Sequence, residues 1–231
     1  MQHLPLPLTK GRGIKGIGLI NTFQKPSFIE EEKLIVQGYR LIAGLDEVGR
    51  GPLAGPVMAA AVILPCDLHG DWLAEVRDSK QLTPAKREFL SPRIQEAAIS
   101  VGVGGAGHDI VDAWGILEAT HIAMKMAVRQ LSIAPDHLLI DHVRLTEMSM
   151  PQKNITNGDS LCFSIACASI IAKVARDYLM VEYDKEYPGY EFARHKGYCT
   201  RLHLALLHHW GPSPIHRRSF RPVKEIICQK K

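Results

Sequence analysis

A nearly unbroken apolar run at residues 56–64, PVMAAAVIL, restricts the fold more than any other feature of this sequence. The run has the length of a strand and offers no polar side chain to water, which is typical of a strand buried on both faces. Just before it, residues 41–51 (LIAGLDEVGRG) have the pattern of a strand that meets a glycine-rich turn. A sheet covered on both faces is therefore expected.

Segments with helical periodicity alternate with the other strand-like segments. In several stretches apolar residues recur at threes and fours, and Thr83 followed by Pro84 has the pattern of an N-cap and a first helical residue. We expect strands at residues 56–64, 100–105 and 137–141 and in the first part of 41–51, before its glycine-rich turn, and helices at residues 28–39, 82–99, 109–132, 163–187 and 200–211. This alternation predicts an α/β fold with a helical C-terminal segment.

Charge is distributed unevenly along the chain. The whole sequence has a formal net charge of +4, whereas residues 190–231 contain nine lysines and arginines against Glu191 and Glu225. A basic end beside a mildly acidic body is expected where phosphates are bound, although a solvated tail without function has the same composition. Five histidines lie in the same stretch, and we expect them at the surface or beside phosphates: His195, His203, His208, His209 and His216.

The cysteines and the N-terminus exclude several classes of protein. Five cysteines, an odd number without a CxxC pair, predict neither a disulfide framework nor a zinc knuckle, and small, partly buried thiols are expected. No run of ~18 apolar residues predicts a membrane span, and the start of the chain lacks the pattern of a signal peptide. We expect a soluble, cytoplasmic protein and, by default, a monomer.

Four acidic residues occupy positions at which a sheet could bring them together. Asp46 and Glu47 lie at one strand end, Asp141 closes another strand, and Asp159 precedes a strongly apolar helix. Crowded carboxylates repel one another unless a cation is present, and ligation by oxygen alone suits Mg²⁺ or Mn²⁺. Two such ions can activate a water and stabilise the leaving oxygen of a phosphodiester. Solvated surface acids would give the same spacing.

Several sequence blocks resemble the type 2 ribonucleases H, the ribonuclease HII family. They run in order from about residue 41 to 223: GLDEVGRGPLAGPVMAAAVIL, DSKQL, LLID, NGDS followed by SIACASIIAKVARD, and HKGY. The resemblance implies a ribonuclease H-like core with a central mixed sheet flanked by helices. It also implies an N-terminal extension at residues 1–40 and a catalytic domain at residues 41–231, with 190–231 as its basic helical part.

The activity that the resemblance implies is divalent-metal-dependent hydrolysis of the RNA strand of RNA–DNA hybrids. It includes cleavage on the 5′ side of a ribonucleotide embedded in duplex DNA, which leaves a 3′-hydroxyl and a 5′-phosphate, and serves ribonucleotide removal from DNA. The residues that match the metal-binding carboxylates of the family are Asp46, Glu47, Asp141 and Asp159.

The resemblance also implies substrate contacts. Gly49, Arg50 and Gly51 match a motif that contacts the ribose 2′-hydroxyl through the backbone, the group that distinguishes RNA from DNA. Arg50 also offers a planar cation to a phosphate. Tyr198 matches a tyrosine that stacks at the ribose–deoxyribose junction, and Lys80 would lie near the scissile phosphate.

Three positions depart from the family pattern without removing a carboxylate. His142 and Cys199 stand where glycine is common, and Cys167 stands where a small alanine is usual. His142 follows an expected metal ligand, where it could narrow the site or carry protons, although a tolerated surface variant is the simpler interpretation.

Three other functions fit parts of the sequence. GVGGAG at residues 102–107 and GRGIKG at 11–16 match the GxGxxG of dinucleotide-binding oxidoreductases, but the first has no acidic residue at a strand end ~20 residues on and the second follows no strand. A non-catalytic RNA–DNA binder would share the basic tail but has no need for four acids. A zinc hydrolase fails because HLALLHH is not HExxH.

Overall fold

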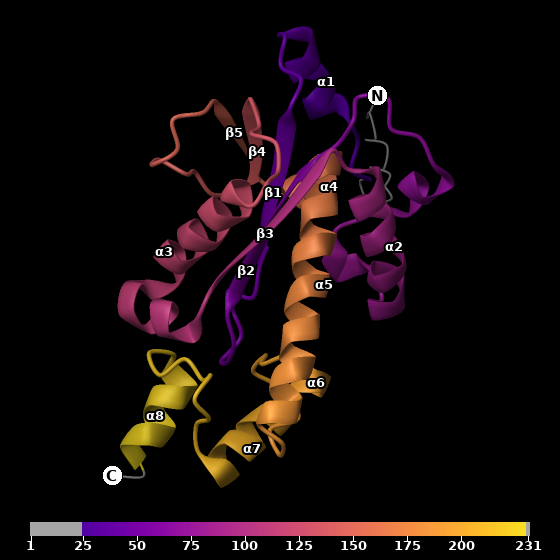
Figure 1. Ribbon diagram of the computed structural model, residues 1–231. Coiled ribbons are helices and arrows are strands. Elements are labelled where there is room, and N and C mark those ends of the chain that lie inside the picture. The colour runs from indigo at the N-terminus through magenta and orange to yellow at the C-terminus, as the bar shows by residue number, and fades with distance from the viewer. Residues whose placement is uncertain (1–24, 230–231) are drawn as a thin grey trace, which may run out of the picture.

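The computed structural model describes residues 25–229, and Figure 1 shows a sheet with helices on both sides. The strands are β1 (Ile42–Val48), β2 (Val57–Ile63), β3 (Ser100–Ala106), β4 (His137–Asp141) and β5 (Gln152–Ile155). The helices are α1 (Ile29–Val36), α2 (Pro84–Ala97), α3 (His108–Arg129), α4 (Gly158–Leu161), α5 (Phe163–Glu186), α6 (Phe192–His195), α7 (Arg201–Trp210) and α8 (Arg221–Gln229). Two short 3-10 helices, η1 (Asp71–Glu75) and η2 (Ser79–Gln81), precede α2.

The five strands form one mixed sheet in the order β3-β2-β1-β4-β5. β2 pairs antiparallel with both β1 and β3, whereas β4 is parallel to both β1 and β5. The expected α/β fold with a central mixed sheet and a helical C-terminal segment is confirmed. β1 lies at the centre of the sheet, so the acidic pair that it carries lies at the centre of the molecule.

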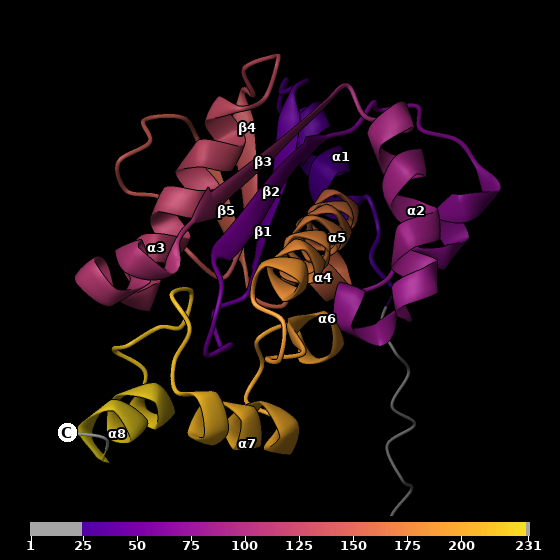
Figure 2. The ribbon, with the colours of Figure 1, turned by 60° about the horizontal axis from the view of Figure 1, so that its bottom comes forward.

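Helices cover both faces of the sheet, as the apolar run at residues 56–64 requires. α3 packs on one face, and α5 together with α2 covers the other (Figures 1 and 2). The strands carry glycine where the helices come closest. A Cβ added at Gly44 would lie 2.3 Å from the backbone carbon of Ser164 in α5, and one at Gly104 would lie 2.3 Å from the backbone oxygen of Ala123 in α3.

This packing gives the glycine pattern at residues 102–107 a structural role. Gly102 and Gly104 lie in β3, which is an antiparallel edge strand, and they let α3 approach its backbone. A dinucleotide motif requires a parallel strand–helix–strand unit, so the oxidoreductase interpretation of this segment does not hold. The other match, at residues 11–16, lies outside the described residues.

The elements observed confirm most of the expectations and correct two. Thr83 does cap α2, since its hydroxyl oxygen accepts a hydrogen bond from the N–H of Lys86 at 3.3 Å. β1 ends at Val48, just before the expected glycine-rich turn. α3 departs from helical geometry at Gly115, where φ is +81°. β5 was not expected, because its short sequence QKNI is polar and it lies at the sheet edge.

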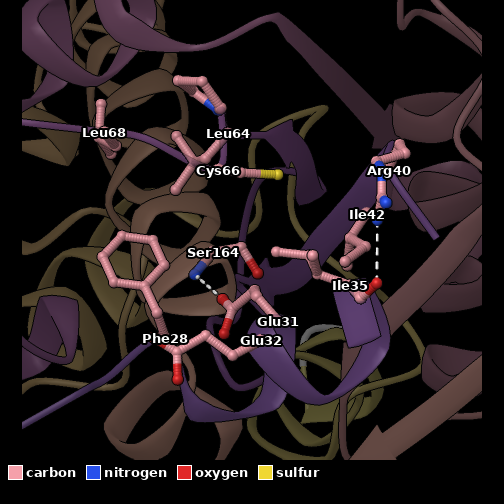
Figure 3. A pocket seen from close by; sticks show the side chains of 11 residues that line it. Phe28, Glu31, Glu32, Ile35, Arg40, Ile42, Leu64, Cys66, Leu68 and Ser164 are labelled. Carbon is pink, nitrogen blue, oxygen red and sulfur yellow. Dashed lines mark hydrogen bonds between the residues drawn. The ribbon is translucent and has the colours of Figure 1, made fainter. Parts of the chain in front are cut away.

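Residues just before the core pack against it through α1. Leu34 belongs to an apolar cluster with Leu139 of β4 and Ile165 of α5. Figure 3 shows Glu31 beside the start of α5, where its Oε1 accepts a hydrogen bond from the N–H of Ser164 at 2.8 Å. This carboxylate supplies a cap for the first turn of α5 from a distant part of the chain. A small pocket opens between α1 and residues 64–68, with Glu31 at its wall.

The C-terminal part is helical and lies at one end of the sheet (Figures 1 and 2). Leu207 of α7 and Val223 of α8 pack with Leu53, which lies in the loop after β1. Gly211 follows the last residue of α7 and precedes Pro212, a common sequence at the end of a helix. Among residues 25–229, no helix has the length and apolar character needed to cross a membrane.

Candidate active site

The sheet register brings the expected acidic residues together. β1 and β4 are parallel, and their last registered pair is Leu45 with Ile140, so Asp46 and Asp141 come next on adjacent strands. Carboxylate oxygens of Asp46, Glu47 and Asp141 all lie within 4.8 Å of one another. Asp46 is 3% exposed and therefore has little water to stabilise its charge.

Burial raises the pKa values of all three carboxyls. Burial raises the pKa of Asp46 well above its usual value, and the charges of Glu47 and Asp141 raise it further. Burial also raises the pKa of Glu47, although the Arg50 guanidinium, 3.3 Å from Glu47 Oε1, opposes this. Burial also raises the pKa of Asp141. The hydrogen bond that Asp141 Oδ1 accepts from the Gly158 N–H at 2.7 Å opposes this increase.

Asp159 lies beside this trio and has a different partner. Its Oδ2 is 3.1 Å from Nζ of Lys80, which extends from η2 and is mostly exposed. Burial alone would lower the pKa of Lys80, but the adjacent Asp159 carboxylate raises it above its usual value. The structure thus brings three of the four expected carboxylates into one cluster and places the fourth next to it, in an ion pair.

The trio has the properties of a site for a hard divalent cation. It offers oxygen donors alone, it carries more negative charge than its burial favours, and Glu47 Oε2 is buried without a hydrogen-bond partner among the described residues. A divalent ion bound by Asp46, Glu47 and Asp141 would remove the mutual repulsion and give that oxygen a partner.

Apart from Lys80, the expected substrate-contact residues lie in two loops that contact each other. Gly49, Arg50 and Gly51 form the turn after β1, and Leu53 of the same loop donates a backbone hydrogen bond to the Gly197 carbonyl oxygen at 2.8 Å. Tyr198 follows that glycine and is 38% exposed. Arg50, which the sequence offers as a cation for a phosphate, pairs with Glu47 here.

The sequence around these residues matches one known protein family. The family model described as "Ribonuclease HII" matches residues 43–223, a range that contains all four acidic residues, Lys80 and Tyr198. The chain belongs to the ribonuclease HII family. It is accordingly a ribonuclease H-type endonuclease and hydrolase that depends on a divalent metal ion, as is general for this family.

Relatives with this name are similar over most of the chain. A ribonuclease HII of Dehalococcoides mccartyi is 56% identical over 202 residues, which are 87% of this chain and 95% of the relative. A ribonuclease HII of Geotalea uraniireducens is 52% identical over 215 residues, which are 93% of this chain and 98% of the relative. The crystal structure of ribonuclease H2 from Pyrococcus horikoshii shares the fold, with a TM-score of 0.68, 23% identity, and coverage of 81% of this chain and 97% of that one.

The histidines of the C-terminal part correct one expectation. His195 is buried rather than at the surface. His203 and His216 are fully buried, and burial lowers their pKa values to about 4 and about 3. Their Nε2 atoms are 3.0 Å apart, and Nδ1 of His203 is 2.9 Å from the Tyr198 carbonyl oxygen. Both rings are therefore neutral near pH 7, and they hold the loop that carries Tyr198. His208 and His209 are exposed, as expected.

The cysteines differ in burial, and the backbone conformation at His142 accounts for the glycine that is common at this position in the family. All five cysteines are free, and two of them, Cys162 and Cys167, are fully buried in the α5 region. His142 is exposed and adopts a left-handed backbone with φ of +56°, which explains why glycine suits this position. Two buried arginines that the sequence did not reveal, Arg176 and Arg217, bind the backbone of the loops in which substrate contacts are expected.

The raised pKa values of the trio predict how metal binding depends on pH. Metal must displace the protons that these carboxyls retain, so the apparent affinity for Mg²⁺ should increase as pH rises through their raised pKa values. Without metal, the folded state binds more protons than the unfolded state, and stability should fall over the same pH range. Thermal unfolding measured over a series of pH values, with and without Mg²⁺, should show a stabilisation by the ion that grows as pH rises. A stabilisation by Mg²⁺ that stays the same across the whole series would contradict binding of the ion by the trio.

Proposed function

We propose that this chain hydrolyses the RNA strand of RNA–DNA hybrids and cuts on the 5′ side of ribonucleotides embedded in duplex DNA. The products would carry a 3′-hydroxyl and a 5′-phosphate, and the cellular role would be ribonucleotide removal in DNA repair and replication. The observation that carries this proposal is the cluster of three carboxylates within 4.8 Å, next to a glycine-rich turn and a tyrosine loop.

The carboxylates are the proposed catalytic and metal-binding residues. Asp46, Glu47 and Asp141 would hold the first ion, and Asp159, which is adjacent to them, would complete a site for two ions of Mg²⁺ or Mn²⁺. When bound, such ions supply an activated water and stabilise the leaving oxygen of a phosphodiester. Asp159 would then exchange its Lys80 partner for an ion, which leaves the lysine ammonium available for the scissile phosphate.

The two loops would supply selectivity for ribose. The turn at Gly49, Arg50 and Gly51 would contact the 2′-hydroxyl through its backbone, and the exposed ring of Tyr198 would stack on the adjoining sugar and base. The ring has cationic neighbours, since Nζ of Lys173 lies 5.5 Å from its centroid. These charges suit a position beside a phosphate backbone.

The domain organisation follows from the same proposal. Residues 41–231 would form the catalytic domain, with the basic helical part at residues 190–231 along the duplex, and residues 1–40 would be an extension. The affinity for the duplex should be strongly salt-dependent because most contacts would be to phosphates. We further propose that the chain acts as a monomer in the cytoplasm.

The test uses a labelled DNA duplex that contains one ribonucleotide. The wild type should cut on the 5′ side of that ribonucleotide with Mn²⁺ or Mg²⁺, and should not cut with chelator. Asp46→Asn removes one charge of the trio and should abolish cleavage, whereas Asp67→Asn, at an exposed position, should leave it unchanged.

Two outcomes would contradict the proposal. Binding of the duplex without cleavage under either metal would favour a non-catalytic binder. Cleavage at the ribonucleotide that survives both chelation and Asp46→Asn would show that the carboxylates are not the catalytic centre.

A further inference from the structure

Two arginines in the interior bind backbone rather than acidic side chains. Arg176 of α5 and Arg217, between α7 and α8, are both 0% exposed. All the hydrogen bonds that their guanidinium groups donate end on carbonyl oxygens of the main chain. Those of Arg217 end on Gly49 at 2.6 Å, Arg50 at 2.9 Å, Pro52 at 2.8 Å and Gly55 at 3.0 Å.

The contacts of Arg217 determine where the backbone N–H groups of the turn point. The peptide bonds described are all trans, so each carbonyl points opposite to the N–H of the following residue. Because the carbonyls of Gly49 and Arg50 point inward to Arg217, the N–H groups of Arg50 and Gly51 point away from it. Within residues 25–229 neither N–H donates a hydrogen bond, and Gly51 is exposed with open space at its Cβ position.

Arg176 binds the other end of the same loop and connects it to the tyrosine segment. Its guanidinium donates to the carbonyl oxygens of Ala54 at 3.1 Å, Pro56 at 3.0 Å and Lys196 at 2.9 Å. The last of these lies two residues before Tyr198, whose ring centroid is 5.7 Å from the Arg176 guanidinium carbon. One side chain therefore fixes the spacing between the turn and the tyrosine.

We propose that Arg176 and Arg217 are positioning residues that aim the N–H groups of Arg50 and Gly51, and the ring of Tyr198, at one ribose. This inference rests on the proposed function. Two N–H donors held outward form a small site for an oxygen with lone pairs, such as a 2′-hydroxyl. The arginines touch no substrate, and they act only through the direction and spacing of groups that do.

The first test is a pair of conservative variants, Arg217→Lys and Arg176→Lys. Each keeps a long side chain that ends in a nitrogen donor, but one amino group cannot replace a planar group that reaches three or four carbonyls. The KM for a duplex with one ribonucleotide should increase by about tenfold, which corresponds to one or two weakened hydrogen bonds. The inhibition constant of an all-DNA duplex of the same sequence should not change, because that duplex has no 2′-hydroxyl.

A core truncation controls for a general loss of stability. Leu34→Ala in α1 removes a side chain that is 5% exposed, at the end of the molecule away from α7 and α8 (Figure 1). All variants are assayed at a temperature at which circular dichroism shows them folded. Leu34→Ala should leave both the KM and the inhibition constant unchanged.

The outcomes separate this inference from the proposed function. If the wild type does not cut the ribonucleotide duplex, the proposed function fails. If the wild type cuts it and the lysine variants retain the wild-type ratio of KM to inhibition constant, the inference is overturned. The same holds if Leu34→Ala changes that ratio as much as they do.

A second measurement applies even if the lysine variants do not fold. Amide signals of ¹⁵N-labelled full-length protein carrying Asp46→Asn can be followed by NMR on addition of either duplex. The Arg50 and Gly51 amides should shift with the ribonucleotide duplex and not with the all-DNA duplex. Equal shifts with both duplexes would overturn the inference.

Discussion

Replacing Asp141 with asparagine is expected to lower the rate constant for hybrid cleavage by on the order of a thousandfold or more, while it stabilises the metal-free protein. The amide keeps an oxygen for the Gly158 N–H, whose hydrogen bond to Asp141 Oδ1 is 2.7 Å long. It removes a negative charge from a group whose pKa is raised by burial. The local geometry is thus retained while the charge needed for a divalent ion is lost.

The gain in stability should depend on pH in a defined direction. A raised pKa in the folded state means that the ionised carboxyl costs stability above that pKa, and that this cost disappears as pH falls toward the unfolded value. Denaturant unfolding with chelator should therefore show the largest advantage of Asp141→Asn at high pH. Rates are measured with saturating Mg²⁺, and Asp67→Asn serves as the exposed control. A variant that loses activity and also unfolds more easily at high pH would contradict this account.

Replacing Gly44 with alanine is expected to lower the free energy of unfolding by about 3 kcal/mol or more. The added Cβ would lie 2.3 Å from the backbone carbon of Ser164 and 2.5 Å from the backbone nitrogen of Ile165. Both atoms belong to the first turn of α5, which cannot move away as a flexible side chain would. The helix must therefore shift from β1, which carries Asp46 two residues later.

Denaturant titration of the two proteins measures this loss. Gly51→Ala provides the control, because no atom lies within 4 Å of its added Cβ, and its effect on stability should stay within about 0.5 kcal/mol. An equal effect of the two substitutions would show that close packing of α5 on β1 is not what requires glycine at position 44.

Sequence patterns predicted the elements whose determinants are local. The apolar run that became β2 and the capped start of α2 are both recognisable within a few residues. The closeness of Asp46 and Asp141 also follows, since each lies near the end of an apolar strand and such ends can meet at one edge of a sheet. The roles of these residues in metal binding and catalysis stay predictions.

The features that the sequence did not reveal depend on contacts that leave no recognisable pattern in the sequence. Arg176 and Arg217 bind carbonyl oxygens, which every residue carries, so nothing in the composition marks the loop that they hold. His203 was assigned to the surface because it lies in a basic segment, yet its ring is enclosed between Tyr198 and His216. β5 is a short polar strand at the sheet edge, where neither burial nor alternation of apolar residues is required.

Arg217 also affects the order in which parts of the protein can form while the chain is being synthesised. Its hydrogen bonds join residues that are 162 to 168 positions apart. Contacts of such long range form late, because the chain between them must already be made and folded. The last carboxylate, Asp159, leaves the ribosome more than fifty residues before Arg217. The nascent chain thus has every acid of the candidate metal site before it has the side chain that holds the turn after β1.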